Sequence, residues 1–327
     1  MQLDPADTQR YAAITADLQA VTADYPPLLQ TLLAPDLDRL LRSEFSQLAA
    51  LLPAWLSDLI PISVEQQHAL GRAGLWLWWY ASAFDDTLDG GSPAVLPAAQ
   101  QALLNALEGY RRLGLAETPA WAVLQQQALT SAAAYAAELQ ARPSELPALT
   151  EANLAVFTPD LLMDRSAPFG FVVIAQLTLT PADLPAGLAD ALPAAIRHLT
   201  AARQIADDAS DWVADLRRGH LNYASARLIR HLLQASPHAR AALSLEWLAG
   251  HQVAADDVWH GLEQEHAGHC TAATALLAPY APCRLADLIA YQQASDERAW
   301  HELRRHRGFI RSLFNLSAPP TQSNPDR

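Results

Sequence analysis

Two clusters of aspartate, far apart in the chain, constrain this sequence most, because each lies at or near the end of a run that looks helical. The first cluster is Asp85-Asp86-Thr87-Leu88-Asp89, and the second comprises Asp207, Asp208, Asp211 and Asp215. Burying carboxylates without a partner is expensive. A cation is therefore expected between the clusters. Mg²⁺ held by a few carboxylates usually completes its shell with water and phosphate oxygens.

The composition excludes several classes of partner. The chain has 327 residues, 51% of them hydrophobic, and a formal net charge of −13. Such a charge argues against nucleic acid or an anionic membrane as the main partner. The longest uncharged apolar run, Ala73 to Phe84, is too short to span a bilayer. No signal-peptide pattern opens the chain, so we expect a cytoplasmic protein.

The positions of proline and the scarcity of glycine favour helices. Four long runs contain no proline: Ala98–Thr118, Trp121–Arg142, Ala194–Ser236 and His238–Ala278. Pro53, Pro61, Pro119, Pro147, Pro193 and Pro237 lie near run boundaries, where a first helical turn tolerates proline. We predict an all-α protein of roughly ten helices, forming one domain over residues 1–316. The polar, proline-rich segment 317–327 is expected to be a disordered tail.

The first acid cluster ends a predicted helix from Glu65 to Asp89. Asp85 and Asp89 are four residues apart and share a face, which Trp78, Ala81 and Ser82 continue below them. Acids are unfavourable at a helix C-terminus, so three of them there indicate a site and not a solvated end. The pattern predicts an apolar well with an acidic rim, suited to a substrate with an apolar body and a diphosphate head.

The second cluster lies on a predicted helix from His198 to Arg218. Asp207, Asp211 and Asp215 follow one stripe at i, i+4 and i+8. Like charges at this spacing repel one another, so the stripe destabilises the helix unless cations bind. Arg218 precedes Gly219 at the helix end and is interpreted first as a capping charge, with a phosphate contact left open.

Both clusters resemble known motifs. The segment Gln204-Ile205-Ala206-Asp207-Asp208-Ala209-Ser210-Asp211 resembles the second aspartate motif of trans-isoprenyl diphosphate synthases. The stripe also resembles the metal-binding triad of class I terpene synthases, although all three of its positions are Asp here. The first cluster resembles the DDxxD motif of the same superfamily. The resemblance covers Glu65 to Asn222 and implies a single-domain class I isoprenoid synthase helical bundle with a central active-site cavity.

The resemblance also implies a set of site residues. Three Mg²⁺ ions would be held by Asp85, Asp86, Asp89, Asp207, Asp208, Asp211 and Asp215. The diphosphate would contact Arg165, with Arg218, Arg304 and Arg305 as further candidates; the alternative for Arg165 is an ion pair with Asp164 or another acid. The substrate cavity would be lined by Trp78, Ala81, Ser82, Phe157, Phe169 and Gln204. Aromatic faces there would stabilise carbocations.

The choice between reactions depends on basic residues. Elongating synthases carry Arg-Arg-Gly shortly after the first motif and Gly-Lys-Arg near the N-terminus. Here Gly90-Gly91-Ser92-Pro93 follows the motif, and all 22 basic residues are Arg. We therefore expect a terpene synthase that converts one linear C15 or C20 prenyl diphosphate to a hydrocarbon or alcohol plus diphosphate. The alternatives are a trans-prenyltransferase, a head-to-head squalene- or phytoene-type synthase, and a noncatalytic partner subunit. A homodimer is common in the family.

Overall fold

The chain folds into helices and connecting loops. The computed structural model describes residues 3–88 and 91–313, and these contain no β-strand. The α-helices are α1 (Pro5–Ala23), α2 (Pro27–Leu41), α3 (Glu44–Trp55), α4 (Val64–Leu88), α5 (Leu96–Arg112), α6 (Pro119–Ala141), α7 (Glu151–Ala155), α8 (Pro159–Arg165), α9 (Phe171–Leu179), α10 (Leu188–Arg217), α11 (Tyr223–Ala235), α12 (Leu245–His251), α13 (Asp256–Leu277) and α14 (Arg284–Leu313). Over these described ranges, none of the helices combines the length and apolar character that a bilayer crossing needs. The predicted all-α class is confirmed.

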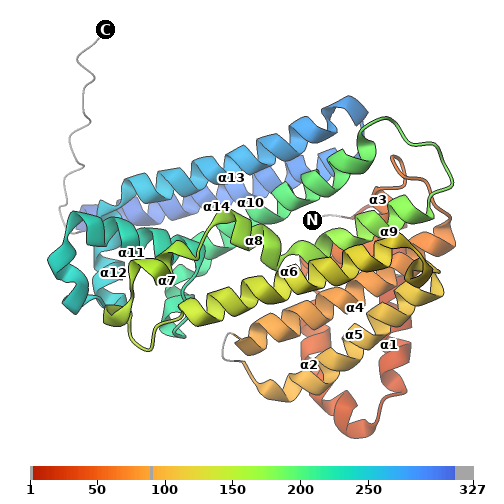
Figure 1. Cartoon of the computed structure of the whole chain (residues 1–327), viewed down its shortest axis with the longest axis horizontal. Coiled ribbons are helices and arrows are strands. Elements are labelled where there is room, and N and C mark those ends of the chain that lie inside the picture. The colour runs from red at the N-terminus through yellow and green to blue at the C-terminus, as the bar shows by residue number, and fades with distance from the viewer. Residues whose placement is uncertain (1–2, 89–90, 314–327) are drawn as a thin grey trace.

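Helix α10 links two hydrophobic cores. In Figure 1, α10, α13 and α14 run side by side along one edge, and α4 and α5 lie on the other side of α6. The first half of α10 contributes Leu192 and Ile196 to a core shared with α1 to α5 and α9. Its second half contributes Ile205 and Trp212 to a core shared with α11 to α13. One long helix therefore fixes the acid stripe relative to both halves of the molecule.

Helix α4 is held by a close crossing with α3. A Cβ atom on Gly71 would lie 2.2 Å from the carbonyl oxygen of Ala50, and one on Gly74 would lie 2.9 Å from that of Ala49. Only glycine allows the two backbones to approach so closely. The helix ends at Leu88 and matches the predicted range closely, but Asp89 and Gly90 lie outside the described residues, as does the predicted tail at 317–327.

The helices differ from the prediction in three respects. Helix α10 begins at Leu188 and not at His198, with Pro193 inside it, and Pro53 lies inside α3. Pro193 lies in the second turn, where little of the backbone hydrogen-bond ladder precedes it. Residues 143–187 contain three short helices, so the described chain has fourteen α-helices where about ten were expected. Thr150 and Thr158 cap the first two of these, starting a new helix each time.

A buried ion pair joins α13 to α14. His266 Nε2 lies 2.9 Å from Asp296 Oδ2, and the two side chains are 2% and 11% exposed. Gln292 Nε2 donates to the other carboxylate oxygen, and Gln292 Oε1 accepts from Arg203 on α10. Burial acts to lower the pKa of His266, but its hydrogen bonds with Asp296 and Cys270 outweigh burial and raise the pKa to about 9.

Replacing His266 with glutamine is expected to flatten the pH dependence of stability in alkaline solution. Because folding raises the pKa of His266, the ion pair's contribution is complete below the unfolded pKa of about 6.5 and is lost as the pH rises through about 9. The shift corresponds to a contribution on the order of 3 kcal/mol. Urea unfolding across this window measures it, with His260→Gln, an exposed histidine on α13, as the control. Equal pH slopes in wild type and His266→Gln would contradict the expectation.

Candidate active site

A cavity of about 790 Å³ lies among α3, α4, α5, α6 and α10. Five of the six residues predicted to line it do so: Trp78, Ala81, Ser82, Phe169 and Gln204. Phe157 does not, because it is buried in the core around the second half of α10. Apolar side chains make up most of the wall, and polar groups gather around the carboxylates at the end of α4.

Aromatic rings form one wall of the cavity. Phe45 stacks on Trp78 with ring centroids 4.6 Å apart, and Trp78 meets Phe169 edge to face at 5.4 Å. The guanidinium carbon of Arg203 lies 3.4 Å from the centroid of Phe45. Phe45 and Arg203 were not predicted. No motif marks Phe45, and Arg203 precedes the recognisable part of the second acid motif by one residue.

Asp85 and Asp86 of the first acid cluster lie at the rim of this cavity. Asp85 accepts a hydrogen bond from the Tyr135 hydroxyl on α6 at 3.2 Å. Asp86 forms an ion pair with Arg39, which reaches over from the end of α2. All four of these residues line the cavity. Arg39 is therefore a cation at the rim that sequence reasoning missed.

Arg165 is held in place by partners from two helices. Its guanidinium donates to Glu138 Oε2 on α6 at 3.0 Å and to Gln204 Oε1 on α10. Glu138 also pairs with Arg142, and its side chain is only 8% exposed. The alternative partner Asp164 instead accepts from Arg197 at 3.4 Å. Arg165 is therefore ion-paired with Glu138, and not with its sequence neighbour Asp164.

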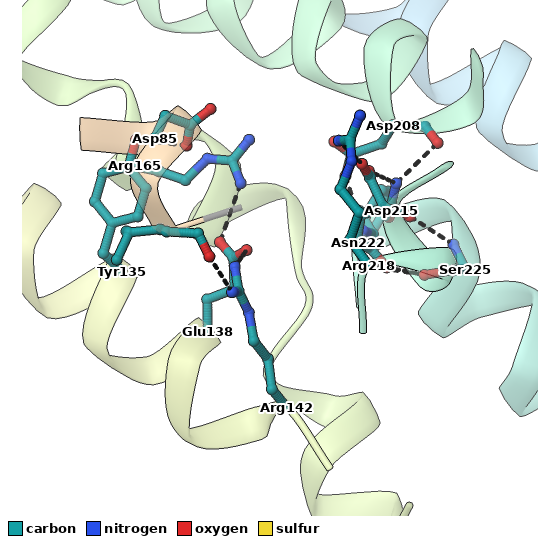
Figure 2. Close-up of polar contacts among 12 residues, drawn as sticks. Asp85, Tyr135, Glu138, Arg142, Arg165, Asp208, Asp215, Arg218, Asn222 and Ser225 are labelled. Carbon is teal, nitrogen blue, oxygen red and sulfur yellow. Dashed lines mark hydrogen bonds and ion pairs between the residues drawn. The ribbon is translucent and has the colours of Figure 1, made fainter. Parts of the chain in front are cut away.

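The charge of Arg165 acts on both acid clusters. Burial acts to lower the pKa of Arg165, but the charges of Asp85 and Glu138 outweigh burial and hold it well above its usual value. In Figure 2, Asp85, Tyr135 and Glu138 lie on one side and Asp208 and Asp215 on the other, with the Arg165 side chain extending from the first group toward the second. A dianionic or trianionic ligand between the two groups would find this guanidinium as a fixed donor.

Asp208 has a structural role in this arrangement. The Oδ2 atom of Asp208 accepts a hydrogen bond from the backbone N–H of Tyr223 at 2.8 Å. The backbone carbonyl oxygen of Asp208 accepts one from Asn222 Nδ2 at 3.1 Å. Burial raises the pKa of Asp208 to about 8. The Asp208 carboxylate caps the N-terminus of α11. Like Asp207, Asp211 and Asp215, Asp208 does not line the cavity. The prediction that Asp208 is a metal ligand therefore gains no support.

Asp208→Ala and Asp208→Asn are expected to behave differently. Alanine leaves the buried Tyr223 N–H without an acceptor, a loss of about 1–2 kcal/mol. Asparagine retains an acceptor oxygen, so its cost is smaller and turnover stays within about threefold of wild type, as expected for a group that touches no substrate. Urea unfolding and turnover assays of both variants measure the difference. An inactive but folded Asp208→Asn protein would show that Asp208 takes part in the reaction.

The remaining acids of α10, Asp207, Asp211 and Asp215, form a stripe of negative charge that Arg218 offsets in part at Asp215. Burial and the charge of Asp211 raise the pKa of Asp207. The pKa of Asp215 is also raised, chiefly by burial, although a 2.7 Å hydrogen bond from Asn222 opposes the shift. An oxygen-only set of carboxylates fits Mg²⁺. Within the described residues no three His, Cys, Asp or Glu side chains converge to hold an ion on their own, so ligand oxygens would have to complete its shell.

The other predicted diphosphate contacts lie apart from the cavity. Arg218 Nη1 lies 3.6 Å from Asp215 Oδ1, and the Arg218 side chain is 55% exposed. Arg304 pairs with Glu263 on α13, and Arg305 pairs with Glu302 on its own helix. None of the three arginines lines the cavity. These ion pairs explain the arginines without a phosphate contact.

Comparison with known proteins identifies the fold. No protein-family model matches the chain, and no curated protein matches its sequence. Among solved structures, the chain is similar to a geranyltransferase from Legionella pneumophila, with a TM-score of 0.53 and 16% identity. The similarity covers 89% of this chain and 95% of that one. The chain therefore has the predicted all-α isoprenoid synthase fold over nearly its whole length.

Proposed function

We propose that this protein is a Mg²⁺-dependent class I isoprenoid synthase that acts on a prenyl diphosphate, and that it is a terpene synthase taking one such substrate. The observation that carries the proposal is the apolar cavity with Asp85 and Asp86 at its rim and the guanidinium of Arg165 beside them. An apolar prenyl chain fits the wall, and a diphosphate fits the charged end.

Asp85, Asp207, Asp211 and Asp215 are the residues that would hold Mg²⁺. When bound, Mg²⁺ neutralises the charge that develops on the departing diphosphate. Asp89, outside the described residues, belongs to the same proposed set.

The protein's own groups provide the rest of the proposed mechanism. Arg165, fixed by Glu138 and Gln204, donates to the diphosphate without having to reorganise as the carbon–oxygen bond breaks. The allylic cation then lies against the apolar wall, where Trp78 and Phe169 present aromatic surface. Exclusion of water by this wall delays quenching, and the shape of the cavity guides the folding of the chain before a proton is lost or water is captured.

A trans-prenyltransferase is the second candidate. Condensation with isopentenyl diphosphate needs positive charge near the first diphosphate, to offset repulsion between the two anions. Arg39 supplies a guanidinium at the rim, which weakens the sequence-based case against this reaction. Arg39 is already paired with Asp86 and lies 3.7 Å from Asp36, so a terpene synthase remains the first choice.

Product analysis tests the proposal. The protein is incubated with Mg²⁺ and each of the C10 to C25 prenyl diphosphates, with and without isopentenyl diphosphate, and extracts are analysed by gas chromatography. We expect Mg²⁺-dependent diphosphate release and a terpene product from a C15 or C20 substrate alone. Longer prenyl diphosphates formed only with isopentenyl diphosphate would establish the second candidate. Absence of both products with every substrate would refute the proposal.

A further inference from the structure

Of the described residues, three arginines line the cavity, and Arg203 differs from the other two in having no ion pair. Arg39 pairs with Asp86, and Arg165 pairs with Glu138. In the described part of the chain, no carboxylate lies within ion-pairing distance of the half-buried Arg203. Withdrawing a charge from water without a partner is costly. An anion from outside the chain is therefore expected at Arg203.

A neutral side chain and an aromatic ring hold Arg203 in place. Its Nη1 donates to Gln292 Oε1 on α14 at 2.8 Å, and its guanidinium carbon lies 3.4 Å from the ring centroid of Phe45 on α3. Its Nε–H is buried and has no acceptor among the residues that the structure describes. The guanidinium is thus positioned without being neutralised, and it keeps a hydrogen-bond donor unused.

The carboxylate whose charge acts most strongly on Arg203 is already engaged. Burial lowers the pKa of Arg203, and the charges of Asp296 and Asp207 oppose that shift. Asp296 accepts from Gln292 through one oxygen and pairs with His266 through the other. The pKa of His266 is raised to about 9, so its positive charge offsets Asp296 at neutral pH. Asp296 therefore does not serve as the counterion of Arg203.

Arg203 lies next to the acid stripe of α10. It precedes Asp207 by four residues, so the two side chains share a face of the helix. Burial and the charge of Asp211 raise the pKa of Asp207, whereas Arg203 and Arg165 act in the opposite direction, Arg203 the more strongly of the two. A ligand that bridges Asp207 and the cavity would meet the guanidinium of Arg203.

We propose that Arg203 is a second diphosphate-binding arginine, which donates to a phosphate oxygen near Asp207. This inference rests on the proposed function and adds a binding residue to the same site. Glu138 already shares the charge of Arg165, so Arg165 alone offsets little of the charge of a diphosphate. Hydrogen bonds from a guanidinium to phosphate are charge-assisted and are among the stronger ones in proteins.

Calorimetric titration of the full chain with inorganic pyrophosphate, in the presence of Mg²⁺, tests the proposal without requiring turnover. We expect one pyrophosphate per chain, bound at least tenfold more weakly by Arg203→Met. Arg203→Lys should lose less affinity, because it keeps the charge but not the planar fork. Arg197→Met removes an exposed arginine of the same helix that pairs with Asp164, and it should bind as wild type does.

Melting temperatures without ligand separate binding from a structural role. Arg203→Met removes no ion pair and keeps an unbranched side chain against Phe45, so it should melt close to wild type. A lower melting temperature combined with unchanged pyrophosphate affinity would assign Arg203 to packing and overturn the proposal.

A crystal structure of the wild-type protein with Mg²⁺ and pyrophosphate gives a measurement that needs no variant. We expect a guanidinium nitrogen of Arg203 within about 3.2 Å of a phosphate oxygen. Pyrophosphate bound out of reach of Arg203, or bound equally well by wild type and Arg203→Met, would overturn this inference and leave the proposed function intact. No saturable binding to the wild-type protein would overturn both.

Discussion

Asp207→Ala is expected to abolish turnover of a prenyl diphosphate while leaving the protein folded and at least as stable as wild type near neutral pH. The loss follows if Asp207 holds Mg²⁺ for the leaving group, and we expect a drop of about a hundredfold to a thousandfold or more. The retained stability is expected because the Asp207 side chain is exposed, so its replacement opens no cavity, and because its raised pKa shows that the fold disfavours its charged form. Removing the carboxylate relieves that penalty at any pH above its folded pKa.

A variant of the adjacent residue Asp208 provides the control for Asp207→Ala. Asp208→Asn changes the adjacent carboxylate, which caps α11, and is expected to keep its turnover. Asp85→Ala changes the opposite cluster and should fail as Asp207→Ala does. Diphosphate release, circular dichroism and melting temperature are measured for all three variants. Full turnover in both alanine variants would remove the carboxylates from the proposed mechanism.

Helical periodicity explains why much of the cavity could be predicted. Once residues 65–89 are assigned to one helix, Trp78, Ala81 and Ser82 must share a face with Asp85, because spacings of three, four and seven residues return to the same side. The structure confirms that these residues line one cavity. The face that points inward was indicated by the small and aromatic residues along it.

The partners of the charged groups could not be predicted, because they come from distant segments. Arg39 and Asp86 are 47 residues apart, and Glu138 precedes Arg165 by 27. Glu138 sits in an ordinary helical run, and nothing near it in the sequence marks it as the buried partner of two arginines. The contrast between Asp207 and Asp208 also depends on tertiary structure, since only the docking of α11 shows which of the two is its cap.

Arg165→Met is expected to remove activity and also to destabilise the protein by about 3–5 kcal/mol. The Arg165 and Glu138 side chains are 15% and 8% exposed. Loss of the guanidinium therefore leaves the buried Glu138 carboxylate with its ion pair to Arg142 but without the one to Arg165. The exposed pair of Arg197 and Asp164 provides the matched control: Arg197→Met should cost less than about 1 kcal/mol and leave turnover unchanged.

A double variant separates the two roles of Arg165. In the double variant Glu138→Gln with Arg165→Met, a neutral amide replaces the buried carboxylate. Much of the lost free energy of unfolding should therefore return, as measured by urea unfolding. Turnover should stay lost, because the double variant still lacks the Arg165 guanidinium that faces both acid clusters. If turnover returned together with stability, Arg165 would act through packing alone. The diphosphate would then have to be held by another group of the cavity, for which Arg39 and Arg203 are candidates.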